Sequence, residues 1–442
     1  MAKQNASLTL DELYGKEKIT KAVEVHIIAK SDFSKINERY CDNICKLKCK
    51  ASNTVPILST QVDILIIQDH RNPAGKYDRN PGQQDYIQSG VIDFIAKQAG
   101  LNGLNYRVTS LLKCPASKED FPSGKPPTQT RLQKCFPYLH EEILRTKPKV
   151  ILSLGTATTK ALGLSKHSNS GNRGEIALSE YGPVVITQHP RVLTYIRQNA
   201  RGNVWGPDYM KVIQRDFEKA AKIARGQFTY TKDTLKLAVE KLVKERITIA
   251  KNIEDIVGIV SKINALPENA VISFDTETNS LDPLSSDLKL LSIQFGWRDP
   301  GTQKIVAGVI PLWHRKNTFY NPDEAWNIVL PLLLNADRSK VGHNSKYDIL
   351  VIYWSKGIRV KGVVLDTLLL MHSIESGTQG CYGLKAACWD HLYEEGYAGY
   401  ENELGDLKVL QKARNKELEL ELSEEDESKG EYEEITEMAD AL

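Results

Sequence analysis

The chain has 442 residues, of which 41% are hydrophobic and 26% charged, a balance typical of a globular protein of two or three domains. Its 29 glycines and 18 prolines show no period, so a collagen-like chain is excluded, as are a coiled coil and a wholly disordered chain. The densest apolar run, residues 328–334, is far shorter than a membrane helix, and the charged N-terminal segment lacks a signal-peptide core. We therefore expect a cytoplasmic protein with no membrane partner.

Charge is spread unevenly along the chain. The formal net charge is +2, but residues 417–440 hold 12 acidic residues against the single Lys429. The rest of the chain carries 57 basic and 44 acidic residues. Such a basic body favours a polyanionic partner, most often nucleic acid, although a merely solvated surface fits the composition equally well.

The first half of the chain, after a polar segment at residues 1–58, alternates β-favouring runs with helical patterns. Strands are predicted at residues 62–67, 106–110, 150–154 and 184–187. Helices are predicted at residues 87–99, 130–145, 158–162 and 209–224. This alternation predicts βα units around a mainly parallel sheet, followed by the linker-like stretch QFTYTKDTLK.

A second α/β pattern follows the linker. Strands are predicted at residues 248–249, 270–274, 290–295 and 304–310, the last two antiparallel. Helices are predicted at residues 253–263, 323–334 and 347–355, and residues 363–374 read as a strand and then a helix, with Asp366 near the strand's end. From Glu403 onward the pattern degrades into an acidic, low-complexity tail.

The sharpest chemical signal is VISFDTETNSLD at residues 271–282. Residues two apart on a strand point to the same face, so Asp275 and Glu277 converge. Further on, VGHNSKYDIL places Asn344 and Asp348 four apart, which on a helix puts both side chains on one face and brings a third acid toward the first two. Such oxygen ligands suit two Mg²⁺ or Mn²⁺ ions, the arrangement that phosphodiester hydrolysis needs.

The segments DTET-x-x-L, GHNSKYD and LDTLLL together resemble the first two motifs of the DEDD-type proofreading exonucleases found in polymerase I-like family A DNA polymerases. The resemblance covers about residues 247–393 and implies a ribonuclease H-like 3′-5′ exonuclease domain. It implies three metal-binding catalytic acids, Asp275, Glu277 and Asp348. It also implies contacts with the 3′-terminal nucleotide from Thr278, Leu281 and Asn344, and it leaves Asp366 as a support for the fold.

The third motif of that family, Tyr-x-x-x-Asp on a C-terminal helix, is not found in this chain. The late candidates, Tyr432 with Thr436 and Asp440, have the wrong spacing and lie in the acidic segment. We therefore expect an exonuclease-like domain that lacks its C-terminal motif. It would belong to the N-terminal piece of a longer or split DNA polymerase, whose downstream domain or polypeptide supplies the missing residues.

Cysteines cluster in the first half of the chain. Cys41, Cys45 and Cys49 have three residues between neighbours, and Cys114 and Cys135 follow downstream. Thiolates in such a group suit zinc or an iron–sulfur cluster, each of which needs four ligands. Reduced thiols packed as small apolar side chains are the alternative, and this is the expectation for Cys381 and Cys388 within the exonuclease-like region.

The segments YRVTSLLKCP, KPKVILSLGTATTKALG and VITQHPRVL resemble the family 4 uracil-DNA glycosylases, over about residues 40–224. The resemblance implies a 4Fe-4S cluster on Cys41, Cys45, Cys114 and Cys135, with Cys49 as an alternative to either of the first two. It also implies a glycosylase-like pocket formed by Asp69, Ser110 and His189.

Two recognition features of that pocket are altered. Where the family has GE-x-PG, this chain has QDHRNPAG, with Asp69 the only nearby acid. Ser110 replaces the uracil-recognising Asn and cannot make a two-point amide contact with a flipped base. His189-Pro190 matches the family's HP motif, in which the His stabilises charge on departing uracil, although a structural His fits equally well. We predict weak or absent uracil excision.

The whole chain therefore predicts two α/β domains, in the order seen in the N-terminal half of polymerases of some large DNA bacteriophages, which would place it in host cytoplasm. We assign an N-terminal extension to 1–39, the glycosylase-like domain to 40–225, a linker to 226–246, the exonuclease-like domain to 247–400 and an acidic tail or truncated end to 401–442. The predicted function is metal-dependent 3′-5′ proofreading of DNA during replication. Two alternatives stay open, a glycosylase-type repair enzyme and a non-catalytic DNA-binding or polymerase-docking module.

Overall fold

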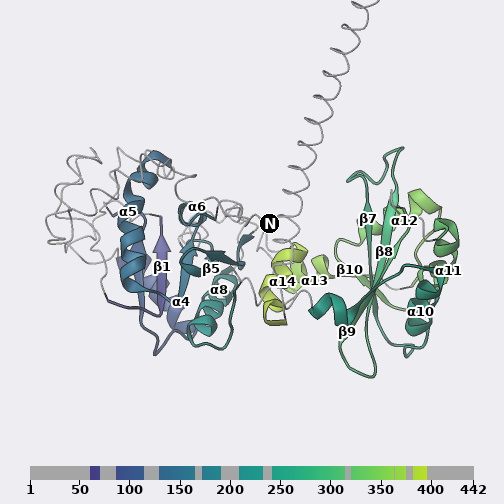
Figure 1. Cartoon of the computed structure of the whole chain (residues 1–442), viewed down its shortest axis with the longest axis horizontal. Coiled ribbons are helices and arrows are strands. Elements are labelled where there is room, and N and C mark those ends of the chain that lie inside the picture. Colours follow the sequence, from purple (N-terminus) through teal and green to yellow (C-terminus); the bar gives the residue numbers. More distant parts are fainter. Residues whose placement is uncertain are drawn as a thin grey trace, which may run out of the picture.

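The computed structural model describes residues 60–69, 86–113, 129–164, 172–190, 209–231, 241–313, 320–362, 364–374 and 382–395. These residues form two α/β units, each built on its own sheet (Figure 1). The predicted division into two α/β domains is therefore confirmed. None of the described helices is long and apolar enough to cross a membrane.

Five strands form the first sheet, in the order β2-β1-β3-β5-β4. Four run parallel: β1 (Ile64–Gln68), β2 (Tyr106–Ser110), β3 (Val150–Leu154) and β5 (Gly182–Thr187). They lie where the β-favouring runs predict them. The fifth, β4 (Ile176–Ser179), pairs antiparallel with β5, and the sequence pattern does not predict it because four residues are too few to show a period.

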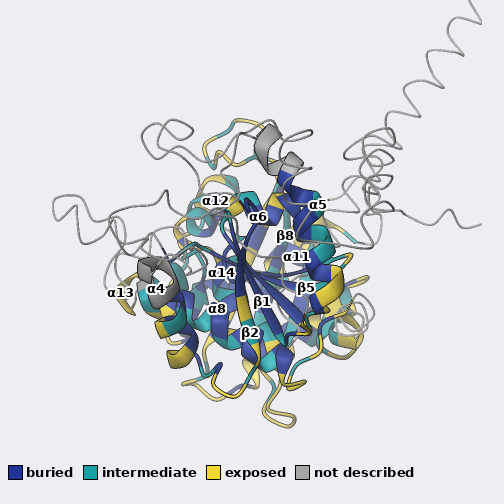
Figure 2. Cartoon of the chain, turned by 90° about the vertical axis from the view of Figure 1, so that its left-hand side faces the viewer, coloured by how far each residue is buried: buried dark blue, intermediate teal, exposed yellow. Residues whose placement is uncertain are grey.

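Helices cover both faces of this sheet: α4 (Tyr86–Gln98), α5 (Gln129–Thr146), α6 (Thr156–Ala161) and α8 (Tyr209–Ala224). Ile64 and Ile66 of β1 pack with α4 and α8, whereas Leu65 and Ile67 pack with α5 and α6. All five residues of β1 are buried, as expected for a parallel strand covered on both sides, and the sheet forms the buried centre of the unit in Figure 2.

Six strands form the second sheet, in the order β11-β10-β7-β8-β9-β6. Their bounds are β6 (Ile247–Ile249), β7 (Ile272–Thr278), β8 (Leu290–Arg298), β9 (Ile305–Pro311), β10 (Lys340–Gly342) and β11 (Val364–Asp366). The strands β7, β8 and β9 are antiparallel neighbours, while β6 is parallel to β9, and β10 is parallel to both β7 and β11. Of these six strands, β10, with three residues, is the one that the sequence pattern does not predict.

The helices of this unit are α10 (Ile253–Asn264), α11 (Pro322–Leu334), α12 (Lys346–Lys356) and α13 (Thr367–Ile374). Ile272 and Phe274 of β7 share one core with apolar side chains of α10, α11 and α12. The alternate residues of β7, Ser273, Asp275 and Glu277, are exposed. We call the face of the second sheet that carries these three residues the open face.

The last described elements are α14 (Leu384–His391) and the 3₁₀ helix η6 (Tyr393–Glu395). They follow the second sheet along the chain but pack on the first unit, and Figure 1 shows α14 beside α8. Trp389 is 1% exposed and belongs to the core that contains Phe217 and Tyr230. The sequence pattern does not predict α14, and its place in the first core falls within the range 247–400 assigned to the exonuclease-like domain.

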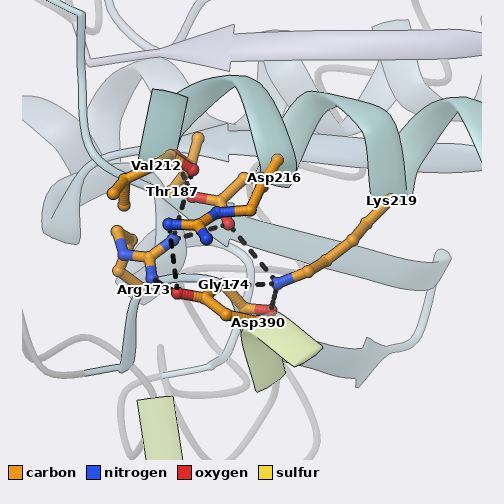
Figure 3. A network of polar contacts seen from close by, with 8 residues as sticks. Arg173, Gly174, Thr187, Val212, Asp216, Lys219 and Asp390 are labelled. Atoms are coloured by element: carbon orange, nitrogen blue, oxygen red, sulfur yellow. Dashed lines mark hydrogen bonds and ion pairs between the residues drawn. The ribbon is translucent and has the colours of Figure 1, made fainter. Parts of the chain in front are cut away.

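A buried ion network fastens α14 to the first unit (Figure 3). Arg173 pairs with Asp390 and donates to Oδ1 of Asp216 at 2.8 Å, and Thr187 donates to Oδ2 of Asp216 at 2.7 Å. Lys219 donates to the carbonyl of Gly174 at 2.8 Å and lies 3.4 Å from Oδ1 of Asp390.

The charges in this network balance one another. Burial alone would raise the pKa of Asp390, but the charges of Arg173, Lys219 and Arg215 hold that pKa below its ordinary value. Burial lowers the pKa of Lys219, and the charges of Asp216 and Asp390 oppose that shift. Gly174 has φ 81°, and a Cβ there would lie 2.9 Å from Nζ of Lys219, so only glycine fits this corner.

Candidate active site

Two of the predicted acids lie side by side on β7. Asp275 and Glu277 both belong to the open face, as the strand period predicts. Their neighbours across the antiparallel ladder are Gln294 and Ser292 of β8. Directly opposed residues in such a ladder share a face, so these four side chains form one polar patch.

Asp348 reaches the same region from the first turn of α12, and it is 4% exposed. On its β7 side, β10 pairs only with Ile272 and Ser273, so the edge of β7 beyond them is open to α12. Thr276 uses that edge: its backbone N–H donates to Oδ1 of Asp348 at 2.9 Å, and its hydroxyl donates to the same oxygen at 2.6 Å. The third acid is therefore locked to the strand that carries the other two.

The pKa values of two of these acids are raised because the carboxylates are desolvated and lie near one another. Desolvation by the surrounding protein, and then the charges of Asp348 and Glu277, raise the pKa of Asp275 to about 6. Desolvation also raises the pKa of Asp348, against the two hydrogen bonds from Thr276. A cation beside these carboxylates would relieve this crowding.

The donor chemistry fits a hard divalent cation, because carboxylate oxygens are the ligands that Mg²⁺ prefers. Within the described ranges, however, no three His, Cys, Asp or Glu side chains converge closely enough to hold a metal ion by themselves. The three acids form an open set, with two on the sheet face and one at its edge. Further oxygen atoms, from substrate, water or other side chains, are needed to complete a cation site.

The prediction that Asn344 and Asp348 share one helical face is wrong. The helix α12 begins at Lys346, and Asn344 precedes it with φ 59°, in the left-handed region. Asn344 is exposed. The four-residue spacing is helical, but Asn344 lies two positions before the helix, in a turn held by contacts with a distant part of the chain.

Asp366 builds that turn rather than adding a ligand. Its carboxylate accepts from the backbone N–H groups of Asn344 at 3.0 Å, Ser345 at 2.9 Å and Leu368 at 2.9 Å. Although desolvation would raise the pKa of Asp366, these hydrogen bonds hold it below its ordinary value. These contacts agree with the expected role of Asp366 as a support for the fold.

The loop after β7 presents an apolar side chain to solvent. The hydroxyls of Thr278 and Tyr347 lie 2.7 Å apart, and each donates to the carbonyl of Ser280, at 2.6 and 2.5 Å. Leu281 follows directly and is 96% exposed. The three-way contact fixes the base of the loop, and Leu281 just beyond it is almost fully exposed to solvent.

Sequence reasoning missed Thr276, Ser292 and Gln294. Thr276 lies between the two quoted acids, and its burial is what the strand period predicts for the residue between two exposed ones. Ser292 and Gln294 are polar residues two apart in an otherwise apolar strand, which is a usable signal of a shared face. Their register opposite Glu277 and Asp275 could not be inferred from the sequence.

The predicted glycosylase-like residues gather at the carboxyl ends of parallel strands, where ligands of open α/β sheets bind. Ser110 ends β2 and is paired in register with Gln68, which ends β1. Gln68 donates through Nε2 to Oγ of Ser110 at 3.0 Å, and its Oε1 lies 3.1 Å from Nε2 of His189. Gln68 is a further residue that sequence reasoning missed. Asp69 follows β1, and its carbonyl accepts from Leu112 at 3.0 Å.

The predicted cysteine ligands lie mostly outside the described residues: Cys41, Cys45, Cys49 and Cys114. Cys135 is described, lies on α5, is 4% exposed and packs in the apolar core between α5 and the sheet. The iron–sulfur cluster stays a prediction. Cys388 packs against the core of the first unit rather than the second, and Cys381 is outside the described residues.

Comparison with known proteins agrees with both halves of the chain. Residues 60–217 match the family model of the uracil DNA glycosylase superfamily, and residues 247–390 match that of a 3′-5′ exonuclease. The chain joins a glycosylase-like domain to an exonuclease domain. The two resemblances seen in the sequence, and their order, are therefore confirmed.

The curated relatives fall into the same two groups. DNA polymerase I of Chloroflexus aurantiacus is 31% identical over 123 residues, which are 28% of this chain and 12% of that protein. Type-4 uracil-DNA glycosylase of Sulfurisphaera tokodaii is 23% identical over 143 residues, which are 32% of this chain and 62% of that protein. The chain thus spans less than two thirds of either relative.

Among solved structures, RNase D of Escherichia coli, an exoribonuclease involved in structured RNA processing, is similar with a TM-score of 0.26 and 15% identity, covering 34% of each chain.

Proposed function

We propose that the exonuclease domain hydrolyses the 3′-terminal phosphodiester of a DNA strand, as the proofreading component of a DNA polymerase. The single observation that carries this proposal is the placement of Asp275 and Glu277 beside Asp348, which Thr276 holds at the open edge of β7. The match of this region to a 3′-5′ exonuclease and its similarity to DNA polymerase I favour DNA as the substrate.

Each group has a distinct part in the proposed reaction. Asp275, Glu277 and Asp348 would hold Mg²⁺ or Mn²⁺, which when bound supplies positive charge to the phosphate. Asp275 must be ionised to do so, and its pKa of about 6 makes it so at neutral pH. The exposed Leu281, on the loop fixed by Thr278 and Tyr347, would pack against the terminal nucleotide, and the exposed Asn344 would contact it through its amide.

The proposed site needs one further contribution. No Tyr-x-x-x-Asp motif occurs in the 442 residues, so a fourth acid would come from a partner, which we propose to be the polymerase domain or polypeptide itself. DNA and this polymerase are the proposed partners of the chain.

The test is hydrolysis of a 3′-mismatched oligonucleotide labelled at its 5′ end, in the presence of Mg²⁺, with and without a family A polymerase lacking its own exonuclease activity. Asp275→Asn should lower the rate by about a hundredfold or more, because it removes a ligand of the cation that would stabilise the charge on the phosphate. Asp337→Asn, at an exposed aspartate after α11, is the matched control and should leave the rate unchanged. Equal rates for the wild type and Asp275→Asn would refute the proposal.

A second proposal concerns the glycosylase-like domain, which we propose binds DNA with little excision of uracil. The contact that favours it is the one between Nε2 of His189 and Oε1 of Gln68, since a His already bonded to a neighbouring amide is less able to stabilise a departing base. An iron–sulfur cluster on the predicted cysteines would stabilise this domain rather than react.

A further inference from the structure

The polar patch on the open face extends from the acids of β7 onto β8. Gln294 lies opposite Asp275, and Ser292 lies opposite Glu277. Cβ atoms of directly opposed residues in an antiparallel ladder are about 5 Å apart, so a long side chain can contact the groups around the residue opposite it. Within β8, Nε2 of Gln294 donates to Oγ of Ser292 at 2.8 Å, so the two side chains are tied to each other.

One atom of this patch is unsatisfied. Oε1 of Gln294 is buried from solvent and has no hydrogen-bond partner among the described residues. A buried carbonyl oxygen without a donor destabilises the folded chain, so such an atom needs an explanation. The neighbouring acids offer none when ionised, because a carboxylate accepts hydrogen bonds and donates none. The missing partner must carry a hydrogen-bond donor or a positive charge.

The bond to Ser292 decides which end of the amide remains available. It uses the nitrogen of Gln294, and the oxygen is thereby left for the missing partner. The three acids do not by themselves enclose a cation in the described part of the chain. Water would therefore be among the ligands that complete a cation site there, and water can donate a hydrogen bond to Oε1 of Gln294.

We infer that Gln294 is a positioning residue of the cation site: its Oε1 accepts a hydrogen bond from water bound to a divalent cation at Asp275, Glu277 and Asp348. Ser292 orients the amide so that its oxygen is presented to that water. This inference rests on the proposed exonuclease function, and it predicts that Gln294 contributes to cation affinity even without DNA.

The test is a titration of the full chain with Mn²⁺, followed by electron paramagnetic resonance of the free ion. Gln294→Met keeps the length of the side chain and removes its oxygen, and it should weaken Mn²⁺ binding about tenfold or more, as loss of an outer-shell partner typically does. Gln294→Glu retains an oxygen at the same reach and should bind at least as tightly as the wild type. Gln98→Met, an exposed glutamine of α4, is the matched control and should bind as the wild type does.

Thermal unfolding without divalent cations distinguishes a role of Gln294 in cation binding from a purely structural one. Gln294→Met removes the unpaired buried oxygen together with the bond from Nε2 to Ser292, whereas Ser292→Ala removes that bond alone. The melting temperature of Gln294→Met should therefore not fall below that of Ser292→Ala. A clearly lower value would overturn the inference, because it would show that the oxygen already has a stabilising partner.

Asp275→Asn separates the inference from the function on which it rests. If Asp275→Asn loses Mn²⁺ binding while Gln294→Met binds like the wild type, the inference fails and the acid site stands. If the wild type and Asp275→Asn bind Mn²⁺ equally, or neither binds it, the proposed cation site fails and the inference fails with it.

Discussion

Arg173 and Asp390 lie 217 positions apart in the chain, and their side chains form an ion pair that is almost completely buried. Asp390 belongs to the segment that matches the exonuclease family, whereas Arg173 belongs to the glycosylase-like match. The pair therefore joins the two halves of the sequence in one core, and it places the final described helix, α14, in the first unit.

Replacing Asp390 should destabilise the first unit strongly. Asp390→Asn leaves Arg173 and Lys219 buried with one fewer negative charge, and breaking a buried pair in this way costs about 3 to 5 kcal/mol. The measurement is urea unfolding of the full chain, followed by the fluorescence of Trp389 and its neighbours. Glu394→Gln removes the more exposed pair with Lys222 and should cost less than about 1 kcal/mol. Similar losses for both variants would contradict the importance of the buried network.

Thr276→Val should alter the pH dependence of DNA hydrolysis. The valine keeps the shape of the side chain but removes the hydroxyl bond that opposes the rise in the pKa of Asp348. That pKa should move further up, so the acidic limb of the pH–rate profile should shift to higher pH, with a smaller change in the plateau. A profile that keeps its midpoint would show that Asp348 does not titrate in the reaction.

Asp275→Asn should stabilise the chain when no divalent cation is present. Because the pKa of Asp275 is raised to about 6, its folded form favours the proton, and this stabilising contribution is lost as the pH rises from 4 through 6. At pH 7 the asparagine removes a crowded charge, a gain on the order of 1 kcal/mol that should raise the melting temperature by about 2 to 4 °C. The gain should vanish below pH 4, where the aspartate is protonated, and a gain that persists there would point to another cause.

Asp366→Asn should weaken the fold without removing a cation ligand. Its carboxylate accepts three backbone N–H bonds, and loss of charge-assisted bonds of this kind costs about 1.5 to 3 kcal/mol. Unfolding in urea should show this loss. Mn²⁺ titration at a temperature where the variant is folded should give the affinity of the wild type, and a loss of affinity comparable with that of Asp275→Asn would make Asp366 a ligand.

Uracil release should be slow or undetectable. Ser110 cannot make a two-point contact with a flipped base, and among the described residues both Ser110 and Nε2 of His189 are already bonded to Gln68. A duplex with a single uracil, treated with the full chain and then with alkali, measures excision as strand cleavage. Efficient cleavage that His189→Ala abolishes would disprove this prediction and favour the repair enzyme instead.

Most of the fold could be predicted because its elements carry their own patterns. The buried strands β1 and β3 and the amphipathic helix α8 show the expected periods within their own sequences. The strand β10 is too short for a period. The position of α14 depends on partners far away in the chain, since Asp390 is stable in the core only opposite Arg173 and Lys219.

The candidate site was predictable to the same extent. Asp275 and Glu277 follow from the period of a single strand. The contact of Asp348 with Thr276, by contrast, depends on where β10 stops pairing, and the place of Gln294 depends on cross-strand register. Neither the contact of Asp348 nor the place of Gln294 can be inferred from a local sequence pattern. Asn344 shows the limit most clearly, because its four-residue spacing from Asp348 suits a helix and the backbone instead takes a left-handed turn.

The position of α14 makes the second sheet an insertion within the first unit. The chain leaves that unit after α8 and returns to it at α14, so two chain segments, rather than one linker, connect the exonuclease domain to the first unit. A protein shortened after Ile374 would keep every residue of the acid site and yet withdraw Trp389 and Asp390 from the neighbouring core. This truncation would therefore destabilise the glycosylase-like domain first, although all of residues 60–217 are retained.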